Sequence, residues 1–217
     1  MSILSPFGRT KIIKRSSLRD KMPVVHPHFL GIYACYQELF KGLSYPLEKF
    51  SEDKYLPLWQ CADDASFYII TQAYSFHHIT ENQVNFLVHT YPTSYESLQR
   101  LYDYCSQEFI AYMSKEHFDV NLIHPSKLLM LINQNLSKKI LLDCHQSLSK
   151  KPHYAMSMNV LSKLLRTSPY HLQKRINDIN KERQRIIETL CQSSHVANKA
   201  INDSNFTIKP ADIWTLI

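Results

Sequence analysis

Glycine is scarce in this chain of 217 residues, which contains only Gly8, Gly31 and Gly42. Phosphate-binding loops and dinucleotide fingerprints need several glycines close together, because their backbone must approach the phosphates without a Cβ in the way. The sequence therefore excludes glycine-rich nucleotide-binding chemistry as the main activity.

Cysteine occurs five times, but the residues are far apart, odd in number and without a CxxC pair. This usage is typical of reduced, mostly buried thiols in a cytoplasmic protein. The eleven histidines form no HxxxH pair and no Cys/His set with the spacing of a zinc site. We therefore expect neither a bound metal ion nor a cofactor.

Long apolar runs are also missing. The chain has no stretch of about 18 apolar residues, and its N-terminus is polar and basic, without a hydrophobic signal core. We therefore expect a cytoplasmic protein that does not contact the membrane. With 44% hydrophobic and 20% charged residues, the composition is that of a globular protein with a core of its own.

Charge is plentiful and unevenly distributed. Residues 1–40 carry six basic and two acidic side chains, residues 41–120 carry five and eleven, and residues 121–217 carry fourteen and six. The basic ends would attract a polyanion and the acidic middle would repel one, unless the charge simply varies along a solvated surface. The first interpretation divides the chain into a basic leader at 1–25, a middle domain at 26–120 and a helical domain at 121–217.

Several helices are expected from the spacing of apolar residues. One lies between Phe29 and Phe40, and a long amphipathic helix begins after Thr93 or Ser94. Two shorter helices are expected within residues 124–151. The fold class predicted from these patterns is mainly α.

A small sheet in the N-terminal half would make the fold α+β instead. Residues 65–90 are rich in aromatic and β-branched residues, and 67–71 and 76–79 have the composition of short strands. Short apolar runs do not distinguish strands from helices, so both remain open for this region. Residues 44–64 are polar and punctuated by proline, and we interpret them as a connection.

The stretch LSKLLRTSPYHLQKRI, residues 161–176, fits two helices joined by a tight turn. Leu161 and Leu165 would face the core, and Ser162 would be the small residue where the helices cross. The pattern predicts a C-terminal helix-turn-helix over about residues 158–177.

The second helix of this motif has a clear start and two clear sides. Ser168 would cap it and Pro169 would take its first position, where a missing N–H costs little. Leu172 and Ile176, four residues apart, would anchor it inward. The polar side chains left on its flanks and outer face are of the kinds that read base edges or hold phosphates: Tyr170, His171, Gln173, Lys174, Arg175 and Asn177.

At these residues the chain resembles the helix-turn-helix of bacterial transcription regulators of the AraC and LuxR types. SPYHLQKRI is similar to the turn and the start of the recognition helix in AraC-type proteins. Arg166 stands where many of these regulators carry glycine, and an arginine is less comfortable there in a left-handed conformation. The residues after Asn177 continue as helix instead of forming a second motif, so the layout is closer to a LuxR-like single motif.

The resemblance implies a sequence-specific, DNA-binding transcription regulator of the bacterial cytoplasm. It would bind double-stranded DNA as a homodimer through the domain at 121–217, while the domain at 26–120 would dimerise or receive an unidentified ligand or protein signal. Residues 161–190 carry seven basic and three acidic side chains, which favours phosphate contacts. The candidate DNA-binding residues are Arg166, Ser168, Tyr170, His171, Gln173, Lys174, Arg175, Asn177, Lys181, Arg183 and Arg185.

Catalytic sets have less support, and we predict no catalytic residues and no enzyme. Cys144 and His145 are adjacent, so their side chains would point apart. The carboxylate pairs at 52–53 and 63–64 fit solvated turns, and the histidine pair at 77–78 lies in the possible sheet. The alternative function is an all-helical adaptor or chaperone whose acidic, aromatic middle holds a partner protein without binding DNA.

Overall fold

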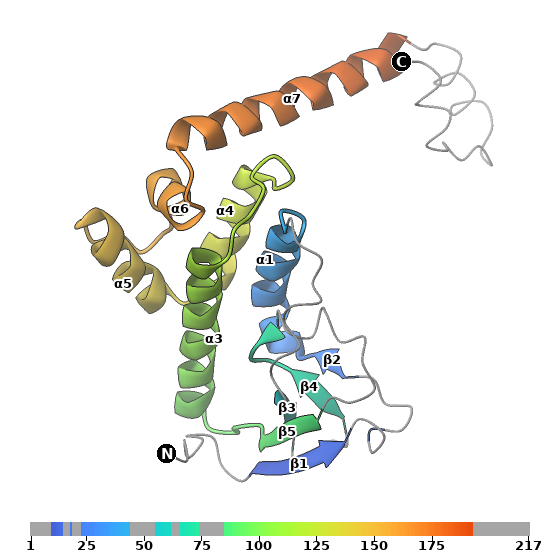
Figure 1. Ribbon diagram of the computed structural model, residues 1–217, viewed down its shortest axis with the longest axis vertical. Coiled ribbons are helices and arrows are strands. Elements are labelled where there is room, and N and C mark those ends of the chain that lie inside the picture. Colours follow the sequence, from blue (N-terminus) through green and yellow to red (C-terminus); the bar gives the residue numbers. More distant parts are fainter. Residues whose placement is uncertain are drawn as a thin grey trace, which may run out of the picture. The chain divides into compact units, whose positions relative to one another are not determined.

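The protein is an α+β molecule with a five-stranded mixed sheet in its N-terminal half and helices in its C-terminal half. The computed structural model describes residues 10–14, 18, 23–43, 55–61, 66–73 and 85–192 (Figure 1). The chain divides into two compact units, Met1–Leu172 and Gln173–Ile217, and each is described by itself.

The sheet has the strand order β1-β5-β3-β4-β2. Its strands are β1 (Thr10–Lys14), β2 (Val24–Val25), β3 (Tyr55–Gln60), β4 (Phe67–Ile69) and β5 (Asn85–Thr90). The pairs β3–β5 and β2–β4 are parallel, and β1–β5 and β3–β4 are antiparallel. A small sheet in the N-terminal half is thus confirmed, with β4 inside the predicted strand at 67–71.

Both faces of the central strand β3 are buried. Leu56 and Leu58 pack with Phe86 and Val88 of β5 in a small apolar cluster. Trp59, which points to the other face, belongs to the main core shared with the helices. Burial on both faces produces a continuous apolar run instead of an alternating pattern.

The prediction that residues 44–64 form a connection was therefore wrong for β3. Pro57 and the polar residues on either side of the YLPLW run obscured a strand that is apolar on both faces. The predicted leader at 1–25 contributes β1 and β2 to the sheet. The second predicted strand, at 76–79, lies outside the described residues.

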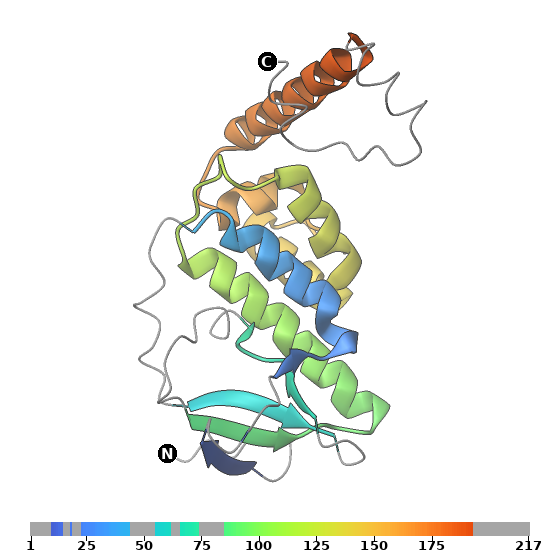
Figure 2. The same cartoon turned by 90° about the vertical axis from the view of Figure 1, so that its right-hand side faces the viewer.

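Two of the described helices agree with the predicted spacing. A short turn of 3-10 helix, η2 (Pro27–Phe29), leads into α1 (Leu30–Phe40), and α3 (Tyr95–Lys115) is the predicted long amphipathic helix. Ser94 caps α3 by accepting a hydrogen bond from the Ser97 backbone N–H at 3.3 Å. Helix α3 runs from the sheet toward α6 in both views (Figures 1 and 2), so one element spans most of the first unit.

Helix α4 (Pro125–Asn135) packs closely against α1. A Cβ on Gly31 would lie 2.0 Å from the Asn135 side chain, so the two helices meet where α1 has no side chain. Glu38 of α1 joins the start of α4: its carboxylate accepts the His124 backbone N–H at 3.0 Å and pairs with Lys127 at 3.3 Å.

The remaining helices are α5 (Lys138–Ser149), α6 (Met158–Leu164) and α7 (Pro169–Gln192). Helices α4 and α5 are the two shorter helices expected within 124–151. Among the described residues, no helix combines the length and the apolar character needed to cross a membrane.

Candidate nucleic-acid interface

Helix α6 is held in place by its cap and by its apolar side. Ser157 accepts the Val160 backbone N–H at 3.4 Å. Val160 and Leu161 are fully buried, and Leu165 just after the helix is 5% exposed. Ser162, the predicted small residue at the crossing, is 1% exposed. The inward face of α6 is therefore as the sequence predicted.

The turn after α6 has its left-handed residue at Arg166, with φ of 51°. The Arg166 and Thr167 backbone N–H groups donate to the carbonyls of Lys163 at 3.2 Å and Ser162 at 2.9 Å, which satisfies the end of the helix. This turn position thus has a positive φ, which glycine adopts most readily, and the chain fills it with arginine. A non-glycine residue in this conformation carries backbone strain.

The Arg166 side chain binds the end of α3. Its guanidinium donates to the Ser114 carbonyl at 2.8 Å and to the Lys115 carbonyl at 3.4 Å, and it lies 3.0 Å from His117 Nε2. A cation is favoured at a helix C-terminus, where carbonyl groups lack helical partners. Arg166 was predicted to hold a phosphate, and the structure places it where it joins the turn to α3.

Helix α7 begins as the sequence predicted. Ser168 accepts the His171 backbone N–H at 3.1 Å, and Pro169 takes the first helical position. Leu172 is fully buried and belongs to the main core together with Leu161 and Leu165. The first turn of α7 is therefore fixed to the first unit by a cap and by an apolar anchor.

Polar and basic side chains cover the outer face of α7. Tyr170 is 72% exposed, and the intervals from it to Lys174, Asn177 and Lys181 keep these side chains on one side of the helix. Of the predicted residues in this helix, the exposed ones are Tyr170, His171, Gln173, Lys174, Asn177, Lys181, Arg183 and Arg185. Gln173 donates to the Asn177 amide oxygen at 3.2 Å, so two side chains that were predicted to read bases lie together.

Arg175 differs from the other predicted residues of α7. It is only partly exposed, and its Nε is buried without a hydrogen-bond partner. An unsatisfied buried donor costs free energy, and because the protein covers this atom a phosphate could be held only by the exposed part of the side chain. Arg175 remains a phosphate candidate in that sense only.

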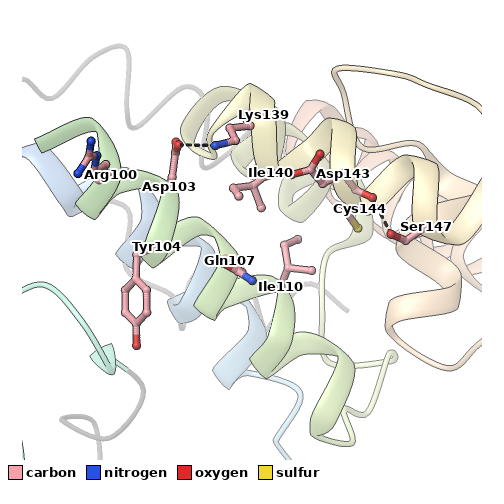
Figure 3. A pocket seen from close by; sticks show the side chains of 10 residues that line it. All are labelled: Arg100, Asp103, Tyr104, Gln107, Ile110, Lys139, Ile140, Asp143, Cys144 and Ser147. Atoms are coloured by element: carbon pink, nitrogen blue, oxygen red, sulfur yellow. Dashed lines mark hydrogen bonds and ion pairs between the residues drawn. The ribbon is translucent and has the colours of Figure 1, made fainter. Parts of the chain in front are cut away.

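A polar groove between α3 and α5 was not predicted from the sequence. It measures about 480 Å³ and presents Arg100 and Lys139 beside Asp103 and Asp143 (Figure 3). Lys139 lies 3.9 Å from the Asp103 carboxylate. Because the charges of the groove largely balance, it favours neither an anionic nor a cationic ligand. Its residues come from two separate helices, so no sequence motif marks it.

Cys144 and His145, the adjacent pair considered for catalysis, have separate surroundings. Cys144 lines the groove, and burial raises the pKa of its thiol. His145 is 8% exposed and donates from Nδ1 to the Lys151 carbonyl at 2.9 Å, while its Nε2 lies 3.1 Å from Ser157 Oγ. Both nitrogens of His145 therefore serve the loop and helix that follow α5.

Glu108 of α3 is a half-buried carboxyl that no sequence pattern marked. It accepts the Gln72 backbone N–H at 2.7 Å, and Gln72 has a positive φ of 50°. Burial raises the pKa of Glu108 to about 7, and the Gln72 hydrogen bond opposes this rise. This contact ties α3 to the chain that follows β4.

Other residues considered for catalysis or metal binding lie outside the described part of the chain. They are the carboxylate pairs at 52–53 and 63–64 and the histidines at 77–78. Within the described ranges, no three His, Cys, Asp or Glu side chains come together in a group that could hold a metal ion.

Comparisons of the chain with protein-family models, with curated proteins and with solved structures gave no match.

Proposed function

We propose that the chain is a DNA-binding transcription regulator that uses α6, the turn after it and α7 as a helix-turn-helix. The observation that carries the proposal is the contrast between the two sides of α7. Leu172 is fully buried on the inner side, whereas Tyr170, Lys174 and Asn177 are exposed on the outer side. A recognition helix needs both an anchored side and a free polar side.

The outer face of α7 would enter the major groove of double-stranded DNA. The amide side chains of Gln173 and Asn177 suit adenine, and the ammonium group of Lys174 suits guanine. Tyr170 and His171 lie at the start of the helix, where a recognition helix contacts base edges. These residues would supply the sequence specificity of the regulator.

Other basic residues of α7 would hold phosphates. Arg175 lies among the proposed base-reading residues, and Lys181, Arg183 and Arg185 extend the positive charge beyond them. Contacts of this kind orient a helix on the duplex without reading its sequence. They would also make binding weaken steeply with salt.

Ser168 and Arg166 would support the interface through their contacts within the protein, although both are exposed. Ser168 caps α7, and Arg166 holds the turn against the end of α3. In the proposed regulator, the N-terminal sheet and helices receive a signal or form a homodimer, and the protein acts in the bacterial cytoplasm. A dimer places two recognition helices on two half-sites of an operator.

Binding of the full chain to random-sequence duplex DNA across a salt series tests this function. Lys174→Ala should weaken binding about three- to tenfold and reduce the salt slope by about 1, because one phosphate or base contact is lost. Lys138→Ala, at an exposed lysine on α5, serves as the matched control and should change binding less than about twofold. Equal binding by both variants and the wild type would remove α7 from the interface.

A further inference from the structure

The loop between α5 and α6 displays basic and aromatic side chains and no acidic ones. Lys150, Lys151, Pro152, His153 and Tyr154 are all exposed, and Tyr154 is 63% exposed. We call these residues the 150–154 loop. They were not among the candidate DNA-binding residues, because their sequence fits no recognition motif.

Buried His145 holds the backbone of this loop from α5. Its Nδ1 donates to the Lys151 carbonyl at 2.9 Å, and its ring lies 5.3 Å from the ring of His153. Lys150 ends α5 with a left-handed φ of 57° and donates its N–H to the Gln146 carbonyl at 3.1 Å. The first half of the loop is thus fixed on its inner side.

Asn133 of α4 fixes the chain where the loop returns to α6. Its side-chain amide donates to the Met156 carbonyl at 3.1 Å and accepts the Met156 N–H at 2.6 Å. Inside the loop, His153 Nδ1 accepts the Ala155 N–H at 3.1 Å. Because the backbone is already ordered, a partner that binds these side chains need not order it.

The lysine pair at the other end of α5 has different surroundings. Lys138 donates to the Asn133 carbonyl at 2.6 Å, and Lys139 lies 3.9 Å from the Asp103 carboxylate. No carboxylate within 4.0 Å is found for Lys150 or Lys151 among the residues that the structure describes. The two pairs carry the same charge, but among the described residues Lys139 has a carboxylate partner and neither lysine of the loop has one.

We propose that the 150–154 loop is a second DNA-contacting element. Lys150 and Lys151 bind phosphate oxygens, and Tyr154 lies against the sugar–phosphate backbone. This inference rests on the proposed function, since it supposes that the chain binds DNA through α7. Ammonium and phenol groups on an ordered loop are suited to backbone contacts, which position a protein and carry no sequence information.

The test compares the lysine pairs at the two ends of α5, each substituted in the full chain. Binding to random-sequence duplex DNA is measured across a salt series. Lys150→Ala/Lys151→Ala should weaken binding about tenfold and reduce the salt slope by about 2, since each phosphate contact contributes about 0.9 to that slope. Lys138→Ala/Lys139→Ala removes the same charge and should weaken binding less than about threefold, leaving the slope within about 0.5 of the wild type.

Each contrary result has its own meaning. An equal loss from both pairs would show that only total charge matters, and it would overturn the proposal for the loop. Normal binding by the loop variant, together with weaker binding by Lys174→Ala, would overturn the loop and leave α7 in place. No binding by the wild type at low salt would overturn both the loop and the proposed function.

Discussion

In the segment from α6 to α7 some side chains contact the rest of the protein and others face solvent, and basic residues occur in both groups. Arg166 is exposed but donates to carbonyls at the end of α3, and Leu172 is buried in the core. On the outer side, Lys174 and Asn177 are exposed to solvent. A basic residue in this segment therefore stabilises the fold or is available to bind a partner, depending on where the turn places it.

The largest expected effect of a substitution is at Leu172. Leu172→Ala should lower the free energy of unfolding by about 2 to 5 kcal/mol, because it leaves a cavity where α7 meets the core. Lys174→Ala, two residues later on the outer side, should stay within about 0.5 kcal/mol of the wild type. Urea denaturation measures the free energy of unfolding of both variants. Similar values would contradict the difference between the two sides of α7.

Arg166 should show an intermediate effect on stability. Arg166→Ala loses the contacts with α3 and keeps a side chain at a positive φ, so we expect a loss of about 1 to 2 kcal/mol. Arg166→Gly loses the same contacts but relieves the backbone, so it should be more stable than the alanine variant by about 0.5 to 1 kcal/mol.

Denaturation and DNA binding together decide the role of Arg166. If its role is to position the turn, both variants should keep the salt slope of DNA binding within about 0.5 of the wild type. Unchanged stability together with a salt slope of DNA binding reduced by about 1 would instead show that Arg166 contacts a phosphate, as Lys174 is proposed to contact DNA.

A smaller effect than at Leu172 or Arg166 is expected at Ser168. Ser168→Ala removes the cap of α7 and should cost about 1 kcal/mol of stability. Ser168→Asn keeps an acceptor at the cap and should restore most of that loss. Thermal denaturation compares the two, and equal losses would mean that the cap does not stabilise the start of α7.

Local signals in the sequence were enough to predict most of the helices. Ser94, Ser168 and Pro169 mark helix starts by their own chemistry, and apolar spacing marks the buried faces. Strand β3 was missed because its signal depends on burial of both faces, which only the assembled sheet supplies.

The surroundings of individual side chains were harder to predict. Nothing near Arg166 in sequence indicates that the end of α3, about 50 residues earlier, lies within reach of its guanidinium. The groove between α3 and α5 and the fixed 150–154 loop likewise depend on contacts between separate helices. The sequence shows the type of each residue, but which side chains make contacts within the protein depends on the fold.

Photo-crosslinking tests the central claim, that the outer face of α7 contacts DNA, most directly. A photoreactive amino acid would replace Lys174 in the full chain, and a matched variant would carry it at Met130, which is 49% exposed on α4. Illumination with duplex DNA should give a covalent adduct from position 174 and little from position 130. Equal adducts from both positions, or adducts from position 130 alone, would contradict the account.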